Sequence, residues 1–455
     1  QPMGPSWGMI LRRKGRDVSF IAGEASLPRR IARIPAVRRS NPAGAGRGYG
    51  LAGAGRAGKH GGMNTPSDPL AAALTLPFEA DAILEGLRPW VECESPTFDA
   101  AAVNRMMDLA ARDLALAGAR IERIPGRPGP TGVMLGGCVR ARFPHPDGEK
   151  PGILLLAHLD TVHPVGTLAA LPFRRDGGRC YGPGIGDMKG GTFLALEAIR
   201  QMVRAGIPAS RPVTVLLTPD EEIGSPSTRD LIEAEARRHA VVLVPEPGRP
   251  GRSPVLGDVV TGRYAIARFG LRTTGRPSHA GASPGEGRSA IREMCRQVLA
   301  IEAMTTEACT FSVGVVHGGQ WVNCVATHCD AEALTMARRQ QDLDAAVERM
   351  LGLRASTPDV ALAVRRGVTR PVWEPSEADL GLYEKARHIG QRLGAGIGHG
   401  SAGGGSDGNF TGALGIPTLD GLGVISAGHH TLGEHLEVDS LVPRAKLLAG
   451  LLASV

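Results

Sequence analysis

From residue 78 onward, segments with helical periodicity alternate with short apolar segments, and this alternation constrains the fold more than any other feature of the sequence. In chain order, the segments are the helices 78–94 and 100–117, the strands 133–143 and 153–157, the helix 189–205, the strand 213–217, the helix 227–238 and the strand 241–244. Buried strands separated by helices are typical of a mostly parallel central sheet that is covered by helices on both faces. The sequence therefore predicts an α/β fold.

The order of elements changes between residues 256 and 368. We expect a strand at 264–274, a helix at 288–304, strands at 310–316 and 330–336, a helix at 343–353 and a strand at 360–364. This β-α-β-β-α-β order is typical of a ferredoxin-like α+β domain. After it the α/β pattern returns, with a helix at 379–393, a strand at 417–419 and a closing helix from 440. Residues 63–255 and 369–455 would thus form one α/β domain, interrupted by an inserted domain at 256–368.

Residues 1–62 are rich in glycine, arginine and proline and lack apolar periodicity, so we expect them to form a disordered basic tail. They contain twelve Lys/Arg and two Asp/Glu. The tail's balance of +10 exceeds the net charge of +7 of the whole chain, so the other 393 residues carry −3. Because phosphate binding needs a basic face on the folded part, this distribution argues against nucleic acid as a partner.

The sequence also indicates where the protein resides. No apolar segment approaches the roughly 18 residues needed to cross a bilayer, so we expect no membrane partner. The charges at residues 12–14 are not followed by an apolar segment, which argues against a secretory signal. The seven cysteines are scattered without a CxxC pair, which favours free thiols in a reducing compartment. We therefore expect a cytoplasmic protein.

Five short motifs gather His, Asp and Glu near the ends of predicted strands. They are AHLDT (157–161), YGPGIGDMKGG (181–191), TPDEEIG (218–224), PEP (245–247) and GHHTLGE (428–434). Ligands of open α/β sheets bind outside the carboxyl ends of the strands, so these motifs could converge in space. Taken singly, each has a simpler explanation; for example, Asp187 could cap a helix, and the acids at 220–222 could begin one.

Together and in this order, the five motifs and SHAGASPGEGRSAI (278–291) resemble the zinc-dependent co-catalytic exopeptidases and amidohydrolases. That family includes carboxypeptidase G-type glutamate carboxypeptidases, acetylornithine deacetylase, succinyl-diaminopimelate desuccinylase and aminoacylase. The resemblance covers about residues 78–455. It implies a catalytic α/β domain with an inserted lid, and a lid that also forms the dimer interface.

The resemblance implies that five residues hold two metal ions: His158, Asp187, Glu222, Glu246 and His430. Asp187 would bridge the ions, with His158 and Glu246 on one and Glu222 and His430 on the other. Nitrogen and oxygen ligands without thiolate suit zinc, with cobalt or manganese as alternatives. Glu at position 246 resembles the carboxypeptidase and deacylase branch of the family.

The resemblance also implies roles for residues around the ions. Asp160 would orient His158, and Glu221 would be the general base that takes a proton from a water shared by the two metals. His279 would stabilise the oxyanion from the other subunit of a homodimer formed through residues 256–368.

Two further residues are candidates for substrate binding. Asn323 matches the family's lid asparagine. Thirteen residues on, where relatives carry an arginine, this chain has Met336, which puts recognition of ordinary amino-acid substrates in question. Arg370 is a candidate for holding a terminal carboxylate, with a surface arginine as the alternative.

We therefore expect a metal-dependent amide hydrolase that acts on an N-acyl amino acid or a small peptide. The acyl group, the leaving amino acid and the native metal stay open. One alternative is a serine hydrolase, because Gly404-Gly-Ser406-Asp-Gly408 fits the G-x-S-x-G pattern, although glycines rather than a buried strand precede it. Another is a non-catalytic metal-binding homologue that keeps the fold.

Overall fold

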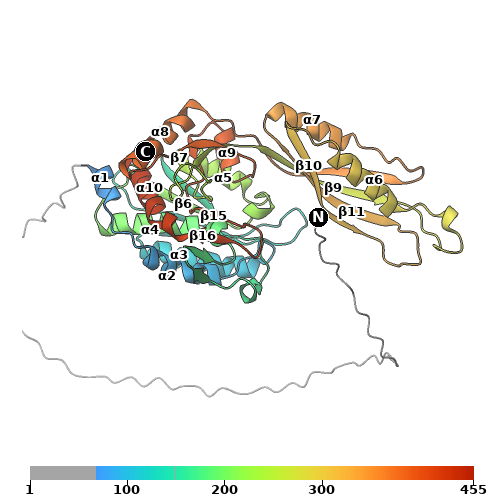
Figure 1. Cartoon of the computed structure of the whole chain (residues 1–455), viewed down its shortest axis with the longest axis horizontal. Coiled ribbons are helices and arrows are strands. Elements are labelled where there is room, and N and C mark those ends of the chain that lie inside the picture. The colour runs from blue at the N-terminus through green and yellow to red at the C-terminus, as the bar shows by residue number, and fades with distance from the viewer. Residues whose placement is uncertain (1–67, 149) are drawn as a thin grey trace, which may run out of the picture. The chain divides into compact units, whose positions relative to one another are not determined.

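A computed structural model of the chain describes residues 68–148 and 150–455 (Figure 1). The tail predicted at residues 1–62 lies outside the described residues. All seven cysteines lie within them and are free thiols. No helix in this part of the chain is both long enough and apolar enough to cross a bilayer.

The central sheet of the described chain has six strands, in the order β1-β2-β6-β3-β7-β14. Their bounds are β1 Arg120–Ile124, β2 Cys138–Arg142, β3 Gly152–His158, β6 Val213–Thr218, β7 His239–Leu243 and β14 Thr418–Leu419. β6, β3, β7 and β14 pair in parallel, whereas β1 pairs with β2, and β2 with β6, in antiparallel fashion. The fold is thus α/β with a mixed sheet.

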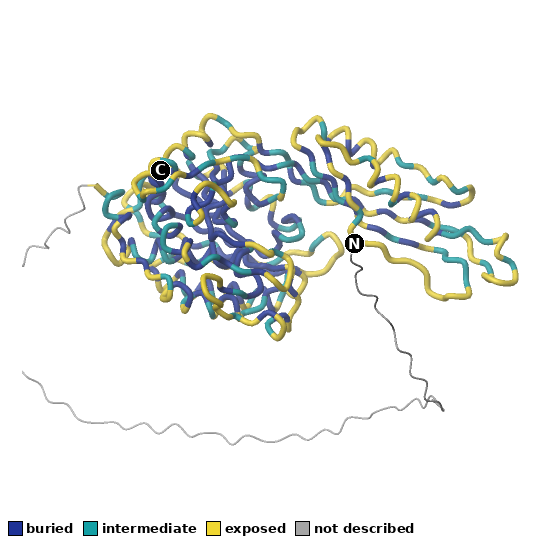
Figure 2. Tube along the Cα trace, in the orientation of Figure 1, coloured by how far each residue is buried: buried dark blue, intermediate teal, exposed yellow. Residues whose placement is uncertain are grey.

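Helices cover both faces of this sheet. Those packed around it are α1 Pro69–Leu74, α2 Ala80–Glu92, α3 Ala100–Leu116, α4 Gly191–Arg204, α5 Arg229–Ala236, α8 Glu377–Arg392, α9 Gly408–Ala413 and α10 Leu441–Ser454. Side chains alternate between the faces of a strand. Ile153 and Leu155 of β3 accordingly join one apolar core with α2, α3, α4, α8 and α10, and Leu154 and Leu156 join another with α5 and α9. β3 is buried along its whole length. Figure 2 shows the interior of this part of the molecule as mostly buried, with exposed residues at its periphery.

A second sheet is antiparallel and has its own apolar core. Its order is β10-β11-β9-β12, with β9 Ala265–Thr274, β10 Cys309–Gly318, β11 His328–Ala337 and β12 Ala361–Arg370. Helices α6 Ala290–Glu302 and α7 Gln340–Leu351 pack on one face. The chain order β-α-β-β-α-β is the one that the sequence predicts. β12 extends to Arg370 and so passes the expected boundary at residue 368.

Smaller sheets complete the described structure. β13 His399–Ala402 pairs with β8 Val259–Arg263. A four-stranded sheet has the order β15-β16-β5-β4, with β4 Arg174–Asp176, β5 Arg179–Tyr181, β15 Ser426–Ala427 and β16 His435–Glu437. These sheets are not predictable from the sequence, because their strands are short and lack a clear apolar pattern.

The strand expected at residues 133–143 is shorter in the structure, where β2 begins at Cys138. Two glycines explain the late start. A β-carbon on Gly136 would lie 2.6 Å from a methyl carbon of Val103, and one on Gly137 would lie 2.6 Å from the carbonyl oxygen of Ile124. Only residues without a β-carbon allow the backbone to approach its neighbours this closely, and the regular pairing of β2 starts after them.

Candidate metal centre

The carboxyl ends of three parallel strands bring the predicted ligands to one edge of the central sheet. His158 is the last residue of β3, Glu221 and Glu222 follow β6 in a short turn, and Glu246 follows β7. Because β3 lies between β6 and β7 and runs parallel to both, their ends must meet. This topology explains why residues distant in sequence are neighbours in space.

The side chains form two ligand groups that share Asp187. The first contains His158, Asp187 and Glu246, and the second contains Asp187, Glu222 and His430. Within each group the candidate ligand atoms lie within 4.8 Å of one another. Asp187 places Oδ1 3.3 Å from Nε2 of His158 and Oδ2 3.4 Å from Nε2 of His430. One carboxylate oxygen therefore faces each group, as a bridging ligand requires.

The adjacent histidines of the fifth motif behave differently. Nε2 of His430 lies 3.2 Å from Oε2 of Glu222, inside the second group. His429 instead places its Nε2 2.8 Å from Oγ of Ser426 and belongs to neither group. Only His430 thus joins the carboxylates, and it is also the histidine that the family resemblance implies.

The electrostatics of the two groups favour a cation. Burial raises the pKa of Glu222 to about 8 and raises that of Glu246 well above its ordinary value. Burial also opposes ionisation of Asp187, but hydrogen bonds from His158 and His430 lower its pKa. Clustered, buried carboxylates are unfavourable without positive charge between them, and oxygen and nitrogen donors are ligands that zinc, cobalt and manganese accept. The residues present therefore fit a pair of divalent ions.

Asp160 holds this edge of the sheet together. Nδ1 of His158 lies 3.0 Å from the main-chain oxygen of Asp160 and 3.5 Å from its carboxylate. That carboxylate accepts a hydrogen bond from the Thr97 hydroxyl at 2.7 Å, and others from the backbone N–H groups of Glu221 and Glu222 at 3.1 and 3.2 Å. Asp160 thus fixes the His158 ring largely through its carbonyl, while its carboxylate fixes the turn that carries Glu221 and Glu222.

Glu434 anchors the loop that presents Asp187, a role that the sequence analysis missed. Its buried carboxylate accepts backbone N–H groups of Gly184, Gly186 and Asp187 at 2.9–3.1 Å. Oε2 also lies 2.7 Å from Nε2 of His163. Leaving such buried donors unpaired costs about 1–3 kcal/mol each, so this carboxylate keeps the loop in place. The only signal in the sequence was the position of Glu434 four residues after His430.

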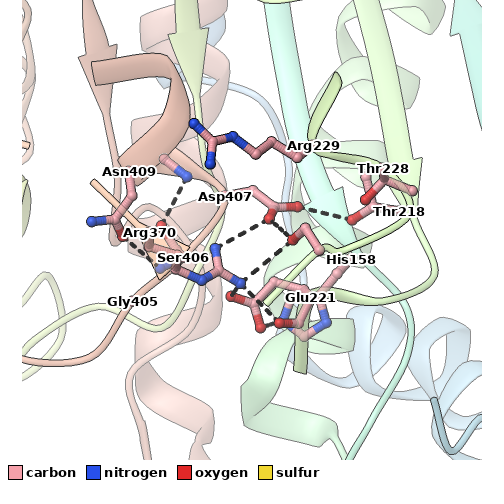
Figure 3. Close-up of polar contacts among 12 residues, drawn as sticks. His158, Thr218, Glu221, Thr228, Arg229, Arg370, Gly405, Ser406, Asp407 and Asn409 are labelled. Carbon is pink, nitrogen blue, oxygen red and sulfur yellow. Dashed lines mark hydrogen bonds and ion pairs between the residues drawn. The ribbon is translucent and has the colours of Figure 1, made fainter. Parts of the chain in front are cut away.

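Glu221 lies beside the first ligand group and is buried. Its Oε2 is 3.9 Å from Nε2 of His158, and its Oε1 accepts a hydrogen bond from Arg370 at 2.7 Å (Figure 3). Burial raises the pKa of Glu221, and the charge of Arg370 opposes this rise. One carboxylate oxygen is thus held by Arg370, and the other is directed toward the ligand groups.

Arg370 is shared between Glu221 and a second buried acid, Asp407 (Figure 3). Its Nη1 lies 3.3 Å from Oδ1 of Asp407, which also accepts a hydrogen bond from the Ser225 hydroxyl. Thr218 donates to the other oxygen of Asp407 at 3.0 Å. The guanidinium of Arg370 is therefore neutralised by side chains of the protein itself. Its role in holding a substrate carboxylate stays a prediction.

Ser406 lacks the surroundings of a nucleophile. The residue is buried, its hydroxyl donates to the carboxylate of Asp420 at 2.6 Å, and it accepts the N–H of Gly408 at 2.9 Å. No histidine of the described chain contacts it. An active serine needs a base within hydrogen-bond reach, so this geometry argues against the serine-hydrolase alternative.

Two predicted residues lie in loops beside the second sheet and do not join the cluster. His279 and Asn323 are exposed and lie close together, since His279 forms a backbone bridge with Cys324 and the N–H of Ala280 donates to the Asn323 carbonyl. Nδ1 of His279 accepts N–H groups of Gly281 and Ala282 at 3.1 and 3.0 Å, so its Nε2 carries the proton. Their predicted roles in catalysis stay predictions.

The carboxylates line a cleft of about 380 Å³. Asp187, Glu221, Glu222 and Glu246 form one part of its wall. Four arginines line the rest: Arg249, Arg263, Arg268 and Arg370. The cleft is thus large enough for a small peptide, with acids where metals would bind and cations around them.

Comparison with known proteins identifies the family of the chain. Residues 154–454 match the model of peptidase family M20/M25/M40, and the chain belongs to this family. It is 30% identical over 379 residues to carboxypeptidase G2 of Pseudomonas sp. (strain RS-16), covering 82% of this chain and 88% of that protein. It is 27% identical over 321 residues to succinyl-diaminopimelate desuccinylase of Azoarcus sp. (strain BH72), covering 66% and 81%. The chain is therefore a hydrolase of this family.

Solved structures share the fold. A tripeptidase from Staphylococcus aureus has a TM-score of 0.65 at 21% identity, with 82% of this chain and 98% of that chain covered. The dipeptidase Dug1p from Saccharomyces cerevisiae has a TM-score of 0.68 at 14% identity, with 84% and 98% covered. At these identities the similarity establishes the α/β architecture alone.

Proposed function

We propose that the protein is a di-metal hydrolase that cleaves the amide bond of an N-acyl amino acid or a small peptide. One observation carries the proposal: two groups of candidate ligands share Asp187, with Glu221 beside them in one cleft. The named relatives, a carboxypeptidase and a desuccinylase, support a carboxypeptidase or deacylase activity. The donor set suits zinc, with cobalt or manganese as alternatives.

The residues of the cleft divide the work of such a reaction. Two divalent ions, when bound, supply Lewis acidity that polarises the substrate carbonyl and lowers the pKa of water. Glu221 takes a proton from the attacking water at its free Oε2 and then delivers it to the leaving amine. Arg370 holds the other oxygen of Glu221, which fixes the direction of proton transfer. Asp160 and Glu434 keep His158 and Asp187 in position.

The second sheet would complete the site in a homodimer. We propose that residues 256–368 form a lid and the dimer interface, and that His279 reaches the cleft of the partner subunit. The protonated Nε2 of His279 is a hydrogen-bond donor of the kind that stabilises an oxyanion. Asn323, which lies next to His279, would contribute a second polar contact to substrate.

Mixing two inactive variants tests this arrangement. Glu221→Gln keeps His279, and His279→Ala keeps Glu221, so one cleft of a mixed dimer contains both groups. Random exchange of subunits is expected to restore about a quarter of wild-type activity, because about half of the dimers are mixed and each has one working cleft. If the mixture stays as inactive as its two components, His279 does not act across subunits.

Removal of metal tests the proposed function itself. Exhaustive chelation is expected to lower hydrolysis of N-acyl amino acids and dipeptides by about 10³-fold or more, because several kcal/mol of transition-state stabilisation are lost. Adding zinc, cobalt or manganese back should restore it, and a serine-directed covalent probe should have no effect. Activity that resists chelation but is blocked by the probe would favour Ser406. A protein that binds metal yet hydrolyses nothing in the panel would favour the non-catalytic alternative.

A further inference from the structure

Arg268 projects into the cleft from strand β9 of the second sheet. Residues 265, 267, 269 and 271 of this strand are buried in the apolar core beneath α6 and α7. Since side chains alternate along a strand, Ile266 and Arg268 lie on the opposite face, and both line the cleft. Nη2 of Arg268 donates to the main-chain oxygen of Glu222 at 3.1 Å, next to the second ligand group.

The arginines of the cleft differ in how their charge is balanced. Arg263 forms an ion pair with Asp420 at 2.6 Å, and Arg370 forms ion pairs with Glu221 and Asp407. Arg268 has no carboxylate within 4.0 Å among residues 68–148 and 150–455. A guanidinium has five N–H donors, and the Glu222 carbonyl accepts from one of them. Arg268 therefore faces the cleft with most of its donors and its charge free.

The residues directly opposite Arg268 on the neighbouring strands are not acids. Glu332 of β11 lies opposite Gly270, two residues further along β9, and forms no ion pair with Arg268 in the described chain. Leu334 of β11 lies directly opposite Arg268. On the other side, the pairing of β9 with β12 shifts between Arg366 and Thr369, so the residues nearest Arg268 there are Gly367 and Val368. Burial and the charge of Arg370 lower the pKa of Arg268, and the charges of Glu221, Glu332 and Glu222 only partly oppose this shift. A bound anion would offset the cost of burying this guanidinium.

We propose that Arg268 binds a carboxylate of the substrate and thereby selects substrates whose leaving amino acid carries a free α-carboxylate. This inference rests on the proposed function. The guanidinium contacts the main-chain oxygen of Glu222, and the side chain of the same residue is a candidate metal ligand. A carboxylate bound by Arg268 would therefore lie close to the scissile amide. The planar fork of arginine pairs with a carboxylate through two parallel hydrogen bonds, which gives direction as well as charge.

The kinetic test uses Arg268→Gln and Arg268→Lys with N-acetyl-leucine, N-acetyl-glutamate and N-acetyl-lysine, each compared with its carboxamide. Arg268→Gln is expected to raise KM for the acids by about 10- to 100-fold, as for loss of a charged hydrogen bond, and to leave the carboxamides nearly unchanged. Arg268→Lys should recover part of the loss. Unchanged turnover of the carboxamides shows that the variant is folded.

Arg272→Gln is the matched control. Arg272 lies on the same strand and the same face as Arg268, but it is exposed and paired with Asp330 at 2.6 Å. Its replacement is expected to leave the preference for acids over carboxamides unchanged. An equal preference in wild type and Arg268→Gln, or an equal loss in Arg272→Gln, would overturn the assignment.

A binding measurement separates this inference from the proposed function. Calorimetric titration with the same acids and carboxamides, under conditions of no turnover, reports the Arg268 contact whether or not the protein hydrolyses them. Tighter binding of acids that is lost in Arg268→Gln supports the carboxylate site even if no hydrolysis is found, in which case the proposed function alone fails. Equal binding of acids and carboxamides by wild type contradicts the site, even if hydrolysis is found.

Discussion

Glu221→Gln is expected to lower kcat by about 10⁴-fold while the protein keeps its metal ions. Proton transfer by a positioned side chain contributes about 10²–10⁴-fold, and we expect the upper end because Glu221 would serve both the attack of water and the departure of the amine. Glutamine preserves the size of the side chain and a hydrogen-bond acceptor for Arg370, so the cleft should keep its shape. The measurement is steady-state kinetics on the best substrate, together with metal content by elemental analysis.

Glu437→Gln serves as a control for this variant. Glu437 lies outside the cleft, where its partly exposed side chain pairs with Arg179 at 3.0 Å. Its replacement should leave kcat within about twofold of wild type, as expected for an exposed ion pair. Turnover by Glu221→Gln within tenfold of wild type would refute the role of Glu221, and loss of metal would identify it as a ligand instead.

Asp187→Asn is also expected to lower kcat by orders of magnitude, in this case because the protein loses metal. Each carboxylate oxygen of Asp187 faces one ligand group, so neutralising this side chain weakens both groups at once. We expect at most one ion per chain and a fall in kcat of about 10³-fold or more, since several kcal/mol of stabilisation depend on the ions. Metal titration followed by calorimetry, with kinetics at saturating metal, measures both effects.

Asp176→Asn is the matched control for Asp187→Asn. Asp176 is an exposed aspartate of β4 whose partner is Arg174. Its neutralisation should change neither the metal content nor kcat. Two ions per chain and near-normal kcat in Asp187→Asn would show that Asp187 is not a bridge.

Much of the fold was predictable from the sequence, because long periodic segments carry a strong signal. The helices around residues 80–92 and 100–116 and the buried strands β3 and β6 lie close to the expected positions. β1 was missed because its sequence, RIERI, reads as a polar edge strand with little apolar pattern. β8 and β13 were missed because they are short and pair through contacts between distant parts of the chain.

The ligands of the candidate site were also predictable, since each lies in a short motif near a strand end. The structure brings all five into two groups around Asp187. Residues that act through tertiary contacts were not predictable in this way. Asp407 was considered only as part of a possible serine motif, although it pairs with Arg370. Arg268 carries no motif, and only the register of β9 places it in the cleft.

The family resemblance leads us to expect an arginine at position 336, where this chain has Met336. Met336 lies on β11 directly opposite Ile266 of β9, and Arg268 is two residues further along β9. A cationic side chain is therefore present on the neighbouring strand, close to the position where an arginine is expected. If Arg268 binds substrate as we propose, it would provide a carboxylate contact that does not need an arginine at position 336.

Anomalous diffraction from crystals soaked in zinc tests the central claim most directly. We predict two zinc peaks per chain in the cleft, one contacted by His158 and Glu246 and the other by Glu222 and His430, with Asp187 in contact with both. Zinc–ligand distances should be about 2.0–2.2 Å. A cleft without zinc peaks, with these five side chains turned away from one another, would contradict the account.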